Sequence, residues 1–201
     1  MLHALIAGAR LATLACNGAD GLPAISLLPM FLVPGEGAQG TLYGHLARAN
    51  PQGTALRAAG RAVAVFRGPE AYVSPSWYPS KAETHRVVPT WNYEAVLASG
   101  AVEVFDDPAR LLAVVTRLTE ANEAGRAIPW AVADAPADFV AAQLKGIVGV
   151  AIRIEALTGK RKLSQNRATP DRDGAIAGLA GSEDARDRAA ADAMARAARG
   201  D

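Results

Sequence analysis

Aromatic and polar side chains concentrate in two neighbouring segments of the chain, residues 71–81 and 88–93. Only 5% of the 201 residues are aromatic, yet these segments hold two of the three tryptophans and three of the four tyrosines. Such a mixture suits a flat conjugated ligand with a polar tail, because aromatic faces pack against its ring while hydroxyls and amides orient it. The alternative is an aromatic mini-core beneath a rigid proline-rich loop.

A cation and a helix start lie close together at residues 48–51. Asn50 followed by Pro51 is typical of a first helical turn, because Asn caps free N–H groups and proline needs no donor there. A helix N-terminus with Arg48 beside it attracts a phosphate group. The alternative is that Asn50 is only a helix cap and Arg48 only a surface charge.

A basic string at residues 160–167 contains Lys162, Gln165 and Arg167. At the end of a strand these long polar side chains would be directed to one side, where they could contact an anionic ligand. The alternative is a solvated edge that protects the last strand from mispairing.

Several functional classes are disfavoured. There is no glycine-rich Rossmann or Walker fingerprint, which argues against a dinucleotide or a triphosphate. The single cysteine, Cys16, lies in an apolar run and is interpreted as a small buried residue. His3, His45 and His85 show no metal-ligand spacing with it, so no metal site is predicted. The net charge of +1 argues against a strong, sequence-independent grip on nucleic acid. Because no signal peptide or long apolar run opens the chain, we expect a cytoplasmic protein that does not enter a membrane.

The elements that must position these residues follow from periodicity and from turn and cap signals. The first three predicted strands, 11–16, 23–33 and 41–45, form an antiparallel meander. The next are 62–66 and, after a turn at 67–69, 72–74; residues 90–105 form one bent strand or a hairpin around Gly100. The last predicted strands are 147–157 and, after a turn at 158–159, 160–164. The predicted helices are 2–10, 51–59 with Gly60 as its stop, 108–124, 136–145 and 170–179.

The end of the chain differs in composition. Residues 183–199 are rich in alanine, with acids and arginines at helical spacing. Propensity favours a helix, but a face of alanines and Met194 buries little surface. We therefore predict a domain over residues 1–181 and a tail over 182–201 that is helical or partly disordered, exposed to solvent or docked on a partner.

Residues 72–81 and 88–93 resemble the signature of the PaiB family, the FMN-binding negative transcriptional regulators. Residues 41–51, 145–149 and 160–167 agree in the same order, and the resemblance covers residues 11–179. It implies a mainly β fold with flanking helices, the antiparallel FMN-binding split β-barrel, with FMN as cofactor. The tail after Gly181 matches no motif of the family.

The resemblance and the residue types together assign the cofactor contacts. The backbone around Leu28 and Pro29 is expected along the ring edge, and residues 90–92 are expected to approach from a neighbouring strand. The predicted cofactor-binding residues are Leu28, Pro29, His45, Arg48, Asn50, Ser74, Ser76, Tyr78, Lys81, Thr90, Trp91, Asn92, Lys162, Gln165 and Arg167.

Related split-barrel flavoproteins imply a homodimer, with each cofactor at the interface and touched by the C-terminal region of the partner. DNA is implied as a partner only by the family resemblance. The rival function is a flavin-dependent oxidoreductase similar to pyridoxamine-phosphate oxidases or flavin reductases. No acid–base pair for a defined substrate is evident. His45 is the one candidate proton donor near the flavin, and the alternative is that it orients the ligand. A third alternative is a barrel that has lost its flavin and serves as an interaction module.

Overall fold

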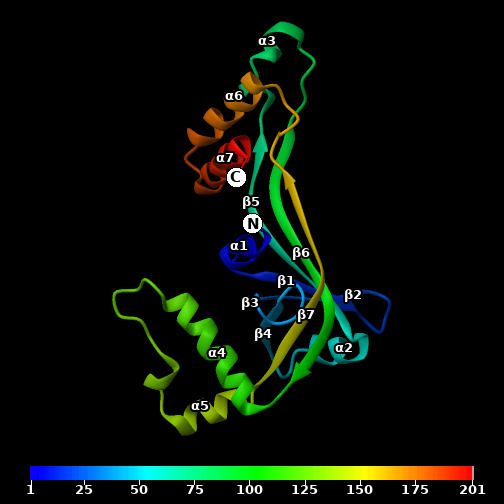
Figure 1. Ribbon diagram of the computed structural model, residues 1–201, viewed down its shortest axis with the longest axis vertical. Helices are drawn as coiled ribbons and strands as arrows, with labels where there is room; N and C mark the ends of the chain where they lie inside the picture. Colours follow the sequence, from blue (N-terminus) through cyan, green and yellow to red (C-terminus); the bar gives the residue numbers. More distant parts are fainter. Residues whose placement is uncertain (201) are drawn as a thin grey trace. The chain divides into compact units, whose positions relative to one another are not determined.

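The computed structural model describes residues 1–200 and consists of a seven-stranded sheet with helices around it (Figure 1). The strands are β1 (Ala12–Asn17), β2 (Pro23–Leu28), β3 (Met30–Val33), β4 (Thr41–Ala47), β5 (Arg61–Val73), β6 (Thr90–Phe105) and β7 (Ile147–Lys162). The helices are α1 (Leu2–Gly8), α2 (Gln52–Ala59), α3 (Ser80–Thr84), α4 (Pro108–Glu123), α5 (Ala137–Leu144), α6 (Thr169–Ala180) and α7 (Ala185–Arg199), with short 3-10 turns η1 (Pro75–Trp77) and η2 (Val132–Asp134).

The order of the strands explains why the sheet forms a barrel. It runs β2-β1-β5-β6-β7-β4-β3, so β2 and β3 lie at opposite edges. Only Pro29 separates these two strands in the sequence. The sheet must therefore roll until its edges meet, which is the antiparallel barrel that the sequence predicts.

Two compact units make up the chain. Unit 1 comprises residues 1–66 and 96–158, and unit 2 comprises residues 67–95 and 159–200. The strands β5, β6 and β7 each contribute residues to both units. The predicted split into residues 1–181 and 182–201 follows a different boundary and remains a prediction.

The core of unit 1 lies inside the barrel. Alternate residues of β1 point inward, so Leu14 is fully buried beside Phe66 of β5 and Leu42 of β4. Ile6 of α1 and Leu56 of α2 close the same core. The predicted stop of α2 is confirmed, because Gly60 adopts the left-handed conformation with φ of 63°.

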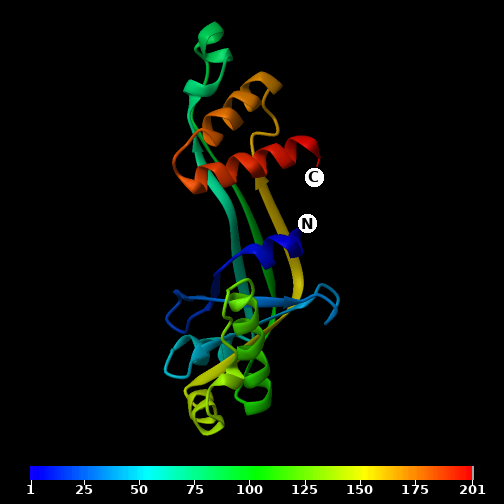
Figure 2. The same cartoon turned by 90° about the vertical axis from the view of Figure 1, so that its left-hand side faces the viewer.

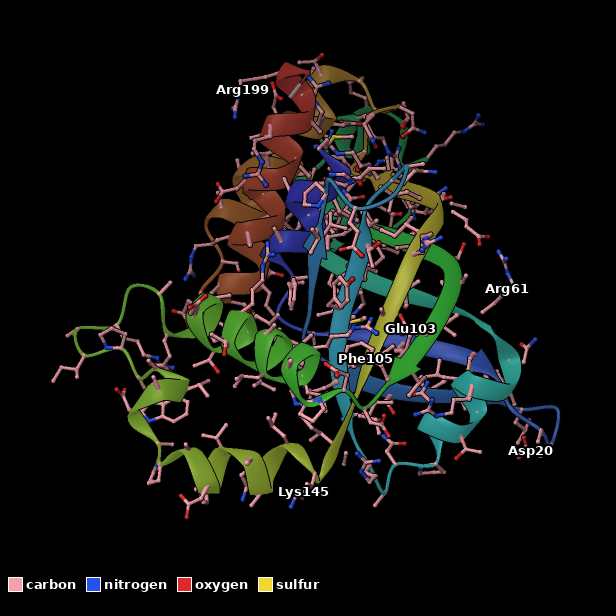
Figure 3. The ribbon with its side chains drawn as sticks, turned by 60° about the horizontal axis from the view of Figure 1, so that its bottom comes forward. Asp20, Arg61, Glu103, Phe105, Lys145 and Arg199 are labelled. Atoms are coloured by element: carbon pink, nitrogen blue, oxygen red, sulfur yellow. The ribbon has the colours of Figure 1, made fainter. Side chains whose placement is uncertain are left out.

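A second core of unit 1 lies between the sheet and α4. The side chain of Asp107 caps this helix by accepting a hydrogen bond from the Arg110 amide at 2.8 Å. Leu111 of α4 packs with Phe105, whose ring lies against Gly149 of β7 where a side chain would collide with it (Figure 3). The missing side chain at Gly149 thus makes room for the ring.

In unit 2, α6 and α7 lie side by side in both views (Figures 1 and 2). One face of α7 is fully buried, through Ala190, Ala193 and Met194, and packs with Leu179 of α6 and Val73 of β5. The expectation of a solvent-exposed tail is therefore wrong. The small side chains bury enough area here because they let two helices approach closely, while Met194 fills the remaining space.

Three expected boundaries are corrected. The run 23–33 is broken at Pro29, so the predicted meander is replaced by the hairpins β1–β2 and β3–β4 at opposite edges. Residues 90–105 form one strand, the first of the two predicted alternatives, whereas the predicted turns at residues 67–69 and 158–159 lie inside β5 and β7. Pairing within the sheet overrides the local turn preference of these glycines and of Pro69. Within residues 1–200, no helix has both the length and the apolar character that a membrane span requires.

Candidate cofactor-binding site

The predicted cofactor-binding residues fall into two groups, one in each unit. Unit 1 holds Leu28, Pro29, His45, Arg48 and Asn50. Unit 2 holds Ser74, Ser76, Tyr78, Lys81, Thr90, Trp91, Asn92, Lys162, Gln165 and Arg167. The side chain of Leu28 belongs to the barrel core, which leaves only its backbone for the expected contact with a ring edge.

Arg48 follows β4 and is held by the segment between α5 and β7. Its Nε donates to the carbonyl of Lys145 at 2.7 Å, and its Nη2 donates to the carbonyl of Ile147 at 3.1 Å. Figure 3 shows Lys145 at the end of α5. The third nitrogen, Nη1, lies 3.6 Å from a carboxylate oxygen of Asp106, in a side chain that is 47% exposed. The two carbonyls thus fix the plane of the guanidinium and leave its Nη1 edge at the surface.

Asn50 fixes the start of α2. Its Oδ1 accepts a hydrogen bond from the Gln52 amide at 2.9 Å, and its Nδ2 donates to Ser26 Oγ at 3.0 Å. The next amides, of Gly53 and Thr54, donate to the carbonyls of Asn50 and Pro51. The expected unpaired amides at this helix start are therefore not found. Asn50 acts here as a cap, and this part of the phosphate interpretation is corrected.

His45 lies on β4, paired with Gly149 of β7. Its Nδ1 is buried and has no hydrogen-bond partner among residues 1–200. Burial lowers the pKa of the imidazole below its ordinary value, because the charged form is poorly solvated there. The ring is therefore neutral at pH 7, with one nitrogen unsatisfied in the protein alone.

In unit 2, the exposed rings of Tyr72 and Trp91 form a pair. Each side chain is 49% exposed, and their ring centroids lie 6.4 Å apart at a tilt of 58°. Trp77 differs, because its ring packs where a side chain at Gly178 of α6 would stand. The aromatic segment therefore contains both predicted kinds of residue, a packed ring at Trp77 and exposed rings at Tyr72 and Trp91.

Hydrogen bonds between residues close in the sequence hold residues 74–81 in place. Ser74 Oγ accepts from the Ser76 amide at 3.2 Å, and Lys81 Nζ donates to Ser76 Oγ at 3.2 Å. Tyr78 is only 2% exposed, and its buried hydroxyl has no partner within the described part of the chain. The guanidinium of Arg167 lies 4.8 Å from the centre of the Tyr78 ring. The Tyr78 hydroxyl is therefore an unused donor in the side chain whose ring faces the Arg167 guanidinium.

The side chain of Asn92 is already engaged within unit 2. The side chain is fully buried, its Nδ2 donates to Ser164 Oγ at 2.9 Å and lies 3.2 Å from Met194 Sδ, and its Oδ1 accepts from Ser164 Oγ at 3.2 Å. Gln165 is similarly engaged, since its amide bonds the backbone of Leu163 and Arg161. Asn92 therefore stabilises the packing of α7, and its contact with a cofactor stays a prediction.

Three cations of unit 2 lie outside ion-pair distance of the described carboxylates, although the charge of Arg167 still contributes to lowering the pKa of Asp171. Lys81, Lys162 and Arg167 form no ion pair with a carboxylate anywhere in residues 1–200. Thr90 is half-buried at the start of β6. Together with the Tyr72–Trp91 pair and the orphaned Tyr78 hydroxyl, these residues fit FMN in kind: rings for its ring system, and cations and a hydroxyl for its phosphate.

Sequence reasoning missed two features. One is the ion pair of Glu94 and Arg161 at 2.7 Å, in which the Glu94 side chain is 8% exposed. No spacing signals it, because the partners lie on different strands. The other is an apolar outer face on the barrel of unit 1, where Ile25 and Leu27 of β2 are 59% and 66% exposed. In β2 the exposed residues alternate with more buried ones. This alternation would have revealed the outer face if the predicted strand had ended at Leu28.

Comparison with known proteins gives the family. Residues 1–156 match the family model FMN_bind_2, described as "Putative FMN-binding domain". An uncharacterised protein of Aspergillus fumigatus is 37% identical over 172 residues, covering 70% of this chain and 66% of the relative. The Bacillus subtilis protein named protease synthase and sporulation protein PAI 2 is 35% identical over 130 residues, covering 65% of this chain and 60% of the relative. The matches thus span slightly less than two thirds of these two relatives, and they confirm the predicted PaiB resemblance.

Solved structures confirm the fold. The "FAD and Heme binding protein" of Mycobacterium smegmatis aligns with a TM-score of 0.59 and 18% identity, covering 87% of this chain and 76% of that one. A conserved hypothetical protein of Mycobacterium tuberculosis aligns with a TM-score of 0.57 and 16% identity, covering 80% and 82%. At these identities the likeness concerns the fold alone. The family match covers most of the sequence, and the chain belongs to the FMN_bind_2 family of FMN-binding domains.

Proposed function

We propose that this protein binds FMN as a homodimer and acts as a negative transcriptional regulator of the PaiB type. The observation that carries FMN binding is the set of exposed rings and unpaired cations within one unit of a chain from an FMN-binding family. The regulatory part is supported by the PaiB signature and by the similarity to the Bacillus protein PAI 2.

In this proposal the residues have separate tasks. Bound FMN supplies a ring system that takes up and releases electrons. Tyr72 and Trp91, which lie in unit 2 together with Lys162 and Arg167, offer exposed ring faces suited to a flat ring system. The Nη1 edge of Arg48 is directed to the phosphate, because the carbonyls of Lys145 and Ile147 already hold the guanidinium plane. Lys162 and Arg167 add positive charge from the partner subunit, as the resemblance implies.

The homodimer is supported by the apolar outer face of unit 1. Residues with odd numbers on β1, on β2 and on β5 as far as Arg67 point away from the core of unit 1. The register places Leu27 opposite Thr13, and Thr13 opposite Val65. Leu97 of β6, 40% exposed, extends the same side. A continuous apolar face on a sheet is unfavourable in water, and a second copy related by a two-fold axis covers it with the same residues.

The oligomeric state can be tested directly. Leu27→Asp places a charge in the proposed interface and should convert the protein to a monomer of 20.8 kDa in light scattering. Leu22→Asp is the matched control, because Leu22 is 68% exposed but lies in the turn before β2. If both variants stay dimeric, this face is not the interface. If the unmodified protein is a monomer at micromolar concentration, the dimer itself is wrong.

The second candidate function is a flavin-dependent oxidoreductase. It is favoured by His45, whose neutral ring has one buried nitrogen without a partner and could hold or donate a proton. The two functions differ in what the FMN-loaded dimer does. A regulator retards its promoter DNA at physiological salt and oxidises no reduced nicotinamide beyond the rate of free FMN. An oxidoreductase consumes reduced nicotinamide repeatedly and binds promoter and random DNA equally weakly.

A further inference from the structure

A separate cavity of about 580 Å³ lies between α4, η2 and α5, entirely within unit 1. Its volume is in the range of small-molecule pockets, which are commonly about 300–1,000 Å³. None of the predicted cofactor residues lines it. The cavity is therefore separate from the predicted cofactor-binding residues.

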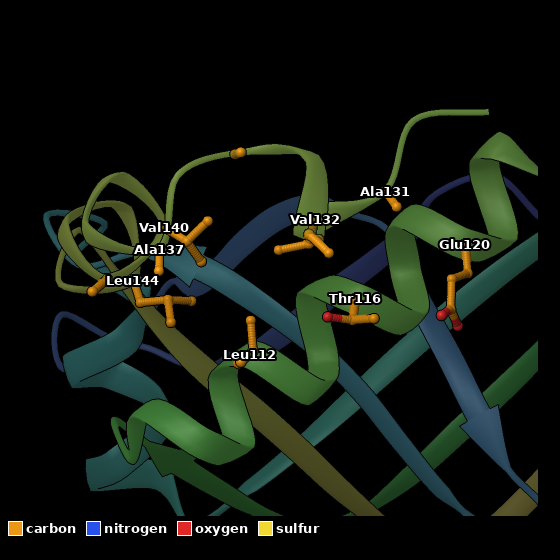
Figure 4. A pocket seen from close by; sticks show the side chains of 11 residues that line it. Leu112, Thr116, Glu120, Ala131, Val132, Ala137, Val140 and Leu144 are labelled. Carbon is orange, nitrogen blue, oxygen red and sulfur yellow. The ribbon is translucent and has the colours of Figure 1, made fainter. Parts of the chain in front are cut away.

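One face of α4 forms a wall of the cavity, and its polarity changes along the helix. Leu112, Thr116 and Glu120 are spaced four residues apart and so lie on one side of the helix. Figure 4 shows Leu112 near Val140 and Leu144 of α5, whereas Glu120 lies toward the other end, on the side of Ala131. The wall thus changes from apolar to hydroxyl to carboxylate along its length.

The charge of this wall comes from a single residue. Glu120 is the only charged side chain that lines the cavity, and it makes no ion pair within the described residues 1–200. Its neighbour Glu123, by contrast, is paired with Arg126 at 3.2 Å. The remaining lining consists of alanine, valine and leucine side chains and the hydroxyl of Thr116. A ligand that fits has an apolar body and a single cationic or donor head.

We propose that this cavity binds a small amphipathic primary amine, with its ammonium group at Glu120 and its apolar body between Leu112, Val140 and Leu144. A carboxylic acid is disfavoured, because its charge would face Glu120. A polyamine is disfavoured, because its second charge would enter the apolar end without a partner. The site is separate from the proposed flavin site and does not depend on it.

Three matched probes test the charge of the head: 4-phenylbutylamine, 4-phenylbutanol and 4-phenylbutyrate. Titrated into the isotopically labelled dimer, the amine should produce saturable shifts of the amides of Thr116, Val132 and Val140. The alcohol should bind about three- to tenfold more weakly, the range expected for losing one charge-assisted contact at a partly exposed site. The carboxylate should bind more weakly still. Equal binding of amine and alcohol would overturn the assignment of the head.

Variants locate the site. Glu120→Gln should lower the affinity for the amine to that for the alcohol, whereas Glu83→Gln, the same change on α3 of unit 2, should leave it unaltered. Ala141→Trp should fill the cavity and abolish binding of all three probes. Unchanged melting temperatures and retained FMN binding show that the variants are folded. The proposal is wrong if the amine does not saturate, if Glu120→Gln has no effect, or if Ala141→Trp dissociates the dimer, which would make the cavity a protein contact.

Discussion

Met194→Ala tests whether α7 belongs to the folded protein. The side chain of Met194 is fully buried with Leu179 of α6 and Val73 of β5. Its removal loses the transfer free energy of the side chain and leaves a cavity, and such changes cost about 2–5 kcal/mol. The Met194 sulfur is 3.2 Å from Asn92 Nδ2, which retains Ser164 Oγ at 2.9 Å, so the polar part of the loss is small. Most of the effect should therefore come from lost packing.

The measurement is urea unfolding followed by circular dichroism and tryptophan fluorescence. Met194→Leu keeps the volume and should cost less than about 1.5 kcal/mol, which separates packing from the sulfur contact. Asp192→Ala is the matched control on the exposed side of α7 and should stay within about 0.5 kcal/mol of the unmodified protein. If Met194→Ala and Asp192→Ala shift the urea midpoint of unfolding equally, α7 does not pack on α6 and β5 in solution, and the prediction of a solvent-exposed tail is correct.

Three further outcomes are expected. Arg48→Ala should lower the affinity for FMN by roughly ten- to a hundredfold, because one charge-assisted contact contributes about 1.5–3 kcal/mol. The affinity for riboflavin, which has no phosphate, should fall far less. Equal losses of affinity for both ligands in fluorescence titrations would assign Arg48 to folding alone. Burial lowers the pKa of His45 in the folded protein below its ordinary 6.5, so the unfolded chain takes up the proton first and the free energy of unfolding falls as the pH drops below 6.5. His45→Gln should therefore make the urea midpoint depend less on pH between about 7.5 and 5.5. Gly178→Ala places a methyl group in the ring of Trp77 and should lower the midpoint, whereas Gly8→Ala, with open space around it, should not.

The sequence predicts elements well where a local signal decides the structure. The caps at Asp107 and the stop at Gly60 work through hydrogen bonds and backbone freedom within a few residues, so α4 and α2 are predicted nearly to their ends. The signal fails where pairing with distant strands decides. The glycines and Pro69 in β5 and β7 favour turns locally, but long neighbouring strands keep the backbone extended. The wrong prediction for α7 has the same origin, because the area that its alanine face buries depends on α6, which packs against it.

The site shows the same limit at the level of single side chains. Residue type predicts what a side chain could bind, but only the structure shows which of its donors and acceptors are already used. Asn92 and Lys162 were equally suitable for a cofactor in the sequence; Asn92 is buried with its amide satisfied, whereas Lys162 is exposed and has no carboxylate partner in residues 1–200. The strongest ligand candidates in this chain are therefore the predicted residues whose polar atoms the protein itself leaves unsatisfied. By this criterion the Tyr78 hydroxyl and His45 Nδ1 rank above Asn50, whose Oδ1 accepts from the Gln52 amide and whose Nδ2 donates to Ser26 Oγ.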